Sequence, residues 1–186
     1  MTNIHAVPRG EIVETLDGKY ELFPLSVDQD TLLAIFKDCF EEWEHIIIGT
    51  MIQGAVWEIR PPRQPRITIL DGYVTVSFQD WHFHVCIGEH KGATAELAKL
   101  RRTSRAELYR RLNKEGKPSS WGLRLFNGAD EQQITFLLPH PLLTDGQQII
   151  KEPDWSRLYL WDRLRHKYLG IGPDPLDRSL SRFSHG

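Results

Sequence analysis

The sequence predicts a single α+β domain in which a mixed, mainly antiparallel sheet is covered by about three helices. The chain has 186 residues, 40% of them hydrophobic, which is enough for one substantial core. Asp71-Gly72 and Asn127-Gly128 each separate two apolar segments, a pattern typical of β-hairpins. Apolar residues at helical spacing occur before, between and after these two hairpins.

The N-terminal region combines turn signals with one clear helix. Residues 1–25 contain an Asp17-Gly18 turn and Pro24, so we expect an N-terminal arm or an irregular strand lying over the domain. Asp28 or Asp30 is expected to cap a helix that runs to about Trp43 or Glu44. The apolar residues of this helix, at steps of three and four, are Leu32, Phe36, Cys39, Phe40 and Trp43.

Short strands are expected next. Residues 46–52 are apolar and β-branched, and residues 55–60 form a strand that two prolines end. Residues 67–78 form a hairpin around Asp71-Gly72, where both turn positions need positive φ. A second reversal at Gln79-Asp80 leads into the following strand. Together these segments predict an antiparallel meander.

The C-terminal half is predicted to contain two helices and a second hairpin. Thr94 is expected to cap a long helix that runs to about Lys114 and has a basic outer face. Residues 121–138 form the hairpin, and a last helix begins after Pro153 with Asp154 as its cap. Residues 174–186 are expected to be a C-terminal tail on the surface. The predicted core stripe of the long helix is Leu97, Leu100, Ser104, Leu108 and Leu112.

The order of elements after Trp81 has a topological consequence. A strand followed by a helix and another strand usually places the two strands parallel, with a right-handed crossover. In this order the C-terminal half resembles a thioredoxin-like fold, and Cys86-Ile87-Gly88 before a helix is similar to thioredoxin-like ferredoxins. Those ferredoxins need four cysteine ligands, whereas this chain has two cysteines. No iron–sulfur cluster is therefore expected.

Two stretches also resemble an uncharacterised bacterial family of unknown function. They are residues 82–92, HFHVCIGEHKG, and residues 120–128, SWGLRLFNG. The resemblance extends to the chain as a whole but implies no activity, so the functional predictions depend on the residues themselves.

Residues 81–91 concentrate side chains that bind metals. At the period of two of a β-strand, His82, His84 and Cys86 share one face. Two imidazoles at i and i+2 have Cβ atoms roughly 6–7 Å apart, so both rings can meet one metal ion. The apolar residues on the opposite face, predicted to be core, are Trp81, Phe83, Val85 and Ile87.

The predicted cofactor is one divalent metal ion, zinc or iron. His82 and His84 are the predicted first ligands, and Glu89, His90 or Cys86 would complete the site. The spacing His-x-His-x4-Glu is similar to the first half of the cupin metal motif. A second motif with a later histidine is not evident, and a long helix does not belong in a plain cupin barrel. The metal ligands are therefore predicted as above, but a cupin fold is not.

Other interpretations of these residues stay open. A surface strand alternates polar and apolar residues, so His82 and His84 also fit a solvent-facing role. Cys86 as a nucleophile would need a base, for which His90 is better placed than His84. Trp57, which alternates with Glu58, is a candidate for lining the pocket of a flat ligand. No catalytic residue is assigned.

Composition limits the partners. A net charge of −2 and a pI near 6.4 give no general attraction to nucleic acid or to anionic membranes. No apolar run approaches the roughly 20 residues that span a bilayer, and the N-terminus lacks a signal-peptide layout, so a cytoplasmic protein with reduced Cys39 and Cys86 is expected.

The leading functional prediction is a small cytoplasmic metal-binding protein with a small-molecule ligand, for which enzymatic activity is left open. The alternative is a non-catalytic binding or assembly domain, such as a homodimer, that uses the histidine face and the basic helix as its partner surface.

Overall fold

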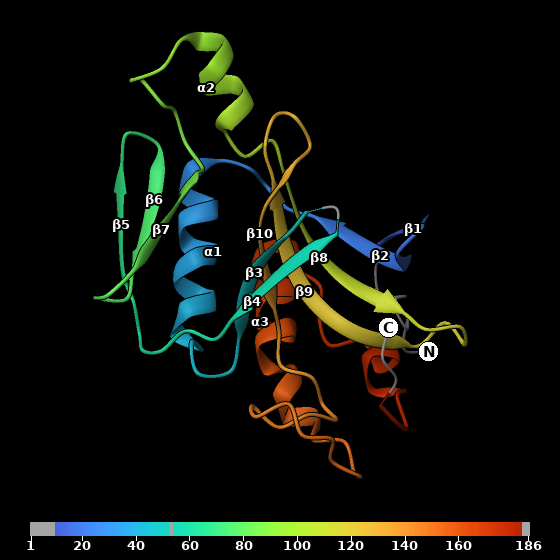
Figure 1. The fold of residues 1–186 in the computed structure, drawn as a ribbon. Helices are drawn as coiled ribbons and strands as arrows, with labels where there is room; N and C mark the ends of the chain where they lie inside the picture. Colours follow the sequence, from blue (N-terminus) through green and yellow to red (C-terminus); the bar gives the residue numbers. More distant parts are fainter. Residues whose placement is uncertain (1–9, 53, 184–186) are drawn as a thin grey trace.

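The computed structural model describes residues 10–52 and 54–183, which form two sheets with one helix between them (Figure 1). The larger sheet has the order β1-β2-β8-β9-β10-β3-β4, and the smaller sheet has the order β5-β6-β7. The strands of the larger sheet are β1 (Glu11–Thr15), β2 (Gly18–Pro24), β3 (Ile47–Ile52), β4 (Ala55–Ile59), β8 (Arg105–Leu112), β9 (Pro118–Phe126) and β10 (Gln132–Leu137). Those of the smaller sheet are β5 (Arg66–Leu70), β6 (Tyr73–Ser77) and β7 (His82–Cys86). The α-helices are α1 (Gln29–Glu41), α2 (Ala95–Arg101) and α3 (Tyr159–Leu169), and the 3-10 helices are η1 (Trp155–Leu158) and η2 (Pro175–Arg178).

The predicted fold class is confirmed. The chain is a single α+β domain with three α-helices in its described part, and every strand pair there is antiparallel. Two local signals worked as expected. The Asp28 carboxylate accepts a hydrogen bond from the Thr31 amide at the start of α1, and Asp71-Gly72 has φ values of 47° and 79° in the β5–β6 turn.

Helix α1 lies between the two sheets and joins their cores. The Phe36 ring packs edge-on against Phe136 of the larger sheet, with ring centroids 5.3 Å apart. One turn later, Phe40 contacts both Phe136 and Phe78, which follows β6. Because this apolar stripe reaches both sides, one helix supports both sheets.

Helix α3 packs against the same face of the larger sheet as α1. The Trp161 ring meets Phe23 of β2 edge-on at 5.9 Å. Lys167 and Tyr168 both bond to the Asp38 carboxylate of α1, at 2.7 Å and 2.6 Å. The opposite face of the larger sheet, which we call the outer face, carries Tyr20, Tyr109, Arg111, Ser120, Gly122 and Arg124.

The prediction of one long helix from Thr94 to Lys114 is wrong. Thr94 caps α2, but this helix ends at Arg101, and Arg105–Leu112 is the strand β8 between β2 and β9. Leucines at helical spacing misled the prediction, because Leu108 and Leu112 also share one face of a strand. Pairing with two neighbouring strands overrides the local helical preference.

The predicted parallel crossover is also wrong. Strand β7 belongs to the smaller sheet and β8 to the larger one, so the helix between them links two sheets instead of two parallel strands. The thioredoxin-like resemblance depended on that crossover and has no support in the structure.

Near both ends of the chain, the described residues form regular elements that the sequence did not predict. Strands β1 and β2 form a regular hairpin, so the description of residues 1–25 as an arm fails for residues 11–24, while residues 1–9 lie outside the described part. The expected surface tail also fails near its start, because η2 brings Asp177 into the interior. Residues 184–186 of that tail lie outside the described part.

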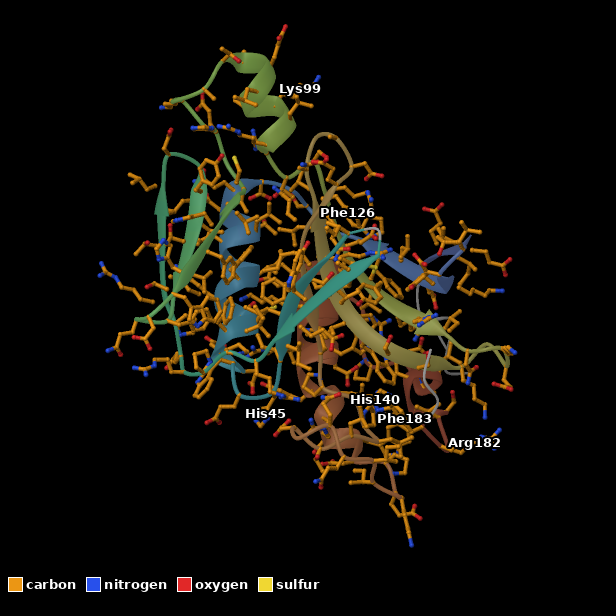
Figure 2. All side chains as sticks on the ribbon, viewed as in Figure 1. His45, Lys99, Phe126, His140, Arg182 and Phe183 are labelled. Carbon is orange, nitrogen blue, oxygen red and sulfur yellow. The ribbon has the colours of Figure 1, made fainter. Side chains whose placement is uncertain are left out.

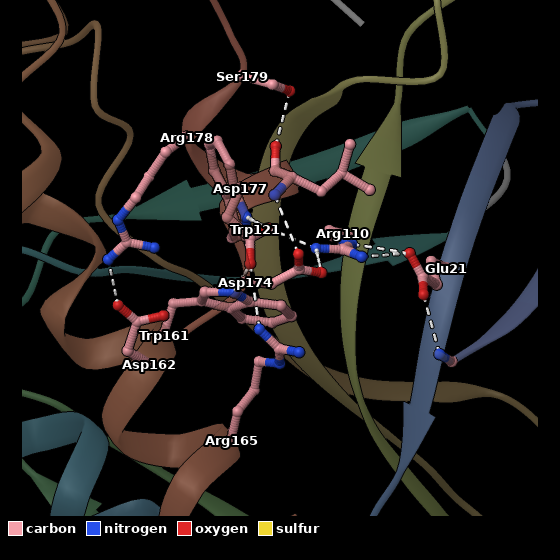
Figure 3. A network of polar contacts seen from close by, with 12 residues as sticks. Glu21, Arg110, Trp121, Trp161, Asp162, Arg165, Asp174, Asp177, Arg178 and Ser179 are labelled. Carbon is pink, nitrogen blue, oxygen red and sulfur yellow. Dashed lines mark hydrogen bonds and ion pairs between the residues drawn. The ribbon is translucent and has the colours of Figure 1, made fainter. Parts of the chain in front are cut away.

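Asp177 is the centre of a buried polar network (Figure 3). Its carboxylate is 0% exposed and accepts hydrogen bonds from Arg110, Arg165, Trp121 and Trp161, at 2.8, 3.1, 2.8 and 2.9 Å. The C-terminal segment therefore supplies the one described ion pair of the buried Arg165 and adds to the pairing of Arg110, which also contacts Glu21 of β2.

Among the described helices, none has both the length and the apolar character needed to cross a membrane.

Candidate ligand-binding site

The histidines of β7 lie together at the surface of the smaller sheet. The rings of His82 and His84 are both exposed, and their centroids are 4.9 Å apart. His84 Nδ1 lies 2.8 Å from the Thr75 hydroxyl on the neighbouring strand. The sequence therefore located this pair correctly on one face of a strand.

The structure does not gather the other predicted ligands around this pair. His90 turns toward the β5–β6 hairpin, where its Nε2 lies 3.4 Å from the Asp71 carboxylate and its ring meets Tyr73. Glu89 is exposed, and Cys86 is 2% exposed with its Sγ directed to the Gly88 carbonyl. In residues 10–52 and 54–183, no group of three or more His, Cys, Asp or Glu side chains is arranged to hold a metal ion.

Burial also changes the chemistry of the two thiols. Both cysteines are free and buried, and desolvation raises the pKa of each. A thiol with a raised pKa is a poor nucleophile at neutral pH. Cys86, which the sequence placed on the chemistry-bearing face, is instead enclosed where β7 ends.

A cleft begins on the outer face of the larger sheet, continues around one end of its strands, and consists of three adjoining hollows of about 170, 260 and 1110 Å³. Arg111 of β8 lines all three hollows. The first two also share Glu58, Ser120 and Leu137. We call these three hollows the outer cleft and number them in that order.

Tyrosines and Arg124 form one wall of the first hollow. The Arg124 guanidinium lies 5.1 Å from the Tyr20 ring centre and 4.9 Å from that of Tyr109, while its Nε donates to Glu107 at 2.6 Å. The Tyr109 ring lies across Gly122, because a Cβ at that position would be 2.6 Å from the ring. Burial raises the pKa of Tyr109, so the phenol stays neutral.

Arg111 is the one cation among the described residues that lines all three hollows of the outer cleft. It donates to the Asp17 carbonyl and lies near the Tyr20 ring, and within the described residues it forms no ion pair with a carboxylate. Its charge is therefore not neutralised by a close partner, unlike that of Arg110, the preceding residue. An unpaired guanidinium in a cleft suits a carboxylate or phosphate group of a ligand.

Two histidines, His45 and His140, line the second hollow, and both lie at one end of the molecule (Figure 2). His140 donates from Nε2 to the Ser119 carbonyl and accepts at Nδ1 from the Leu142 amide, so both ring nitrogens are used. Burial lowers the pKa of His140 to about 4. His45 bonds through Nδ1 to the Asp145 carboxylate at 3.0 Å.

The sequence did not reveal most of this cleft. Trp57 was expected to line a pocket, and it does border the first hollow. Tyr109 was missed and Arg111 was placed on the basic face of a helix, because residues 105–112 were taken for part of that helix. Alternation along residues 105–112, with Leu108 and Leu112 facing inward, is the signal that could have identified them.

Comparison with solved structures identifies the fold. A structure described as the heme binding protein ChuX matches with a TM-score of 0.50 and 12% identity, over 80% of this chain and 76% of that chain. A protein from Agrobacterium tumefaciens matches with a TM-score of 0.52 and 13% identity, over 80% and 71%. A protein from Erwinia carotovora matches with a TM-score of 0.52 and 12% identity, over 81% and 76%. At such low identity these matches show a common fold.

The sequence comparisons give a family. No curated protein matches the chain significantly. A family model described as "Family of unknown function (DUF7676)" matches residues 11–170, which include every strand and α-helix of the described structure. The expected resemblance to a family of unknown function is thereby confirmed, and the chain belongs to the DUF7676 family.

Proposed function

We propose that this protein binds a flat, anionic small molecule of the heme type in the outer cleft. The observation that carries the proposal is Arg111, a guanidinium that lines all three hollows and has no carboxylate partner among the described residues. The similarity in fold to a heme binding protein supports this class of ligand.

The residues of the outer cleft fit such a molecule. A heme has an apolar ring, carboxylate side chains and an iron atom. Arg111 is suited to a carboxylate. Gly49 and Leu137 of the first hollow offer an uncharged surface, and the tyrosine wall offers aromatic edges. When bound, the iron would supply redox or ligand-binding chemistry, whereas the chain holds and orients the molecule.

The test is a titration of the purified protein with hemin, followed by absorbance. We expect saturable binding of one hemin per chain. Arg111→Ala removes one charge-assisted contact. A loss of about 1.5–3 kcal/mol of binding free energy corresponds to roughly 10- to 150-fold weaker binding.

Arg66→Ala, which removes an exposed arginine from the smaller sheet, is the matched control and should bind as the wild type does. Absence of saturable binding, or equal losses in the two variants, would refute the proposal.

A second candidate function concerns His82 and His84. Their exposed rings lie 4.9 Å apart, as a pair of zinc ligands on one strand requires. Because zinc in proteins usually takes four ligands, we propose that a pair from each of two chains completes the site. This proposal combines two predictions from the sequence, a divalent metal ion and a homodimer.

Sedimentation with and without zinc tests the second candidate. A zinc-dependent dimer that His82→Ala abolishes is the expected result, with the exposed His166→Ala as the control. A monomer at every zinc concentration would rule it out.

A further inference from the structure

His45 lies where the polypeptide leaves α1 and enters β3. Its amide donates to the Glu42 carbonyl at 2.9 Å, which closes a turn after the helix and directs the side chain to the second hollow. The ring is partly exposed, with 42% of the side chain accessible. Its position therefore comes from backbone geometry, and its ring remains open to a ligand.

Asp145 orients the His45 ring. The Asp145 carboxylate accepts from His45 Nδ1 at 3.0 Å and from Arg157 Nη2 at 2.6 Å. Burial opposes ionisation of Asp145, but the bonds from Arg157 and His45 outweigh it and lower the pKa of this carboxyl. Asp145 is therefore an acceptor, and the hydrogen of the neutral imidazole is on Nδ1.

This arrangement leaves His45 Nε2 with its lone pair free, because no described group bonds to it. Histidines that bind metals usually donate their other ring hydrogen to a carboxylate in this way. Arg157 in turn donates to the His140 carbonyl at 3.1 Å. The bonded residues His45, Asp145 and Arg157 are therefore fixed at the wall of the second hollow.

The chain alone does not hold a bare metal ion here, since no described group of three or more metal-binding side chains exists. A heme iron differs, because the porphyrin already supplies four nitrogen ligands and the protein needs to add one. A single oriented imidazole is therefore enough for a heme and too little for a free cation.

We propose that Nε2 of His45 coordinates the iron of the heme-type molecule bound in the outer cleft, with Asp145 as the positioning residue. This inference rests on the proposed function. His45 and Arg111 both line the second hollow, so one ligand can meet both residues. His140 lines the same hollow but has no free ring nitrogen, which makes His45 the histidine suited to this role.

The test compares hemin and iron-free protoporphyrin on His45→Ala. We expect the variant to bind protoporphyrin with wild-type affinity, because the carboxylate contact at Arg111 is intact. Its ferric hemin complex should lose the electron paramagnetic resonance and absorbance signature of imidazole ligation. Free imidazole added to the complex should restore that signature by occupying the vacated position.

Two matched variants complete the design. His166→Ala removes an exposed histidine from α3 and should leave the spectra unchanged. Asp145→Asn should keep hemin bound but lower the Fe–N stretching frequency of the ferrous complex, because the imidazole loses its carboxylate partner.

The outcomes separate the two proposals. If the wild type shows no saturable binding of hemin or protoporphyrin, the proposed function fails. If the wild type binds hemin and the spectrum of His45→Ala is identical to that of the wild type, His45 is not the ligand, although the proposed function stands. A circular dichroism spectrum equal to that of the wild type shows that the variant is folded.

Discussion

Replacement of Asp177 by alanine tests whether the C-terminal segment holds the fold together. The carboxylate is fully buried, and all four groups that bond to it are donors, two guanidinium and two indole groups. Alanine leaves these donors without an acceptor. Replacement by asparagine should lower the stability nearly as much, because the N–H hydrogens of its amide would face the N–H hydrogens of these donors.

The expected loss of unfolding free energy depends on which carboxylate partners each arginine retains. Arg110 retains Glu21 at 2.7 Å and Asp174 at 2.9 Å. Arg165 is 0% exposed, its bond to Asp177 is its one ion pair in the described residues, and its Nε and Nη2 already lack partners there. Burial also lowers the pKa of Arg165, and Asp177 is the main group opposing that shift. A buried charge without a partner costs about 3–5 kcal/mol of unfolding free energy.

The assay is urea unfolding followed by tryptophan fluorescence, since Trp121 and Trp161 both donate to Asp177. Asp130→Ala is the matched control. It removes an exposed carboxylate that pairs with Arg105, so we expect a loss below about 1 kcal/mol.

The double variant Asp177→Ala, Arg165→Leu should recover at least about 1 kcal/mol, because it removes the orphaned charge. If Asp177→Ala costs no more than Asp130→Ala, or if Arg165→Leu recovers nothing, Asp177 does not act by neutralising Arg165.

Three further predictions concern single residues. The pKa of His140 is lowered to about 4, so the native state favours the neutral ring; about 3 kcal/mol of stability should be present above pH 6.5 and be lost as the pH falls toward 4. Urea unfolding of the wild type and His140→Gln at several pH values checks this, and parallel curves for the two would contradict it. Gly122→Ala puts a methyl group 2.6 Å from the Tyr109 ring and should cost about 1–3 kcal/mol in the same assay, whereas a stabilised variant would show that the ring moves freely. The buried Cys86 thiol, with its raised pKa, should react with a thiol reagent only after unfolding, and rapid labelling of the native protein would restore its candidacy as a nucleophile.

The elements that the sequence predicted well are those with local signals. The Asp28 cap of α1 bonds to Thr31, only three residues later in the sequence, and the Asp71-Gly72 turn likewise depends on neighbouring residues. Strand β8 is different, because its conformation depends on pairing with β2, about ninety positions earlier in the chain, as well as with β9. Leu108 fits a helix and a strand equally well, so only the distant partner decides between them.

The candidate site divides in the same way. His82 and His84 were placed correctly because both belong to one strand. The outer cleft combines Tyr20, Arg111 and Arg124, which come from three strands whose order was not predicted. His45 and Asp145 are 100 residues apart and meet only in the folded chain. A site built from several distant segments leaves little trace in any one stretch of sequence.

Arg110 and Arg111 show how the fold and the candidate site depend on each other. The alternation of β8 directs Arg110 inward to Asp177 and Arg111 outward to the cleft. In the sequence the two residues look equivalent, yet one is 1% exposed with three carboxylate partners and the other is an unpaired cation in the described cleft. Because both belong to one strand, the C-terminal segment that fixes Arg110 also fixes the direction of Arg111. Loss of Asp177 should therefore weaken both stability and ligand binding, whereas loss of Arg111 should weaken binding alone.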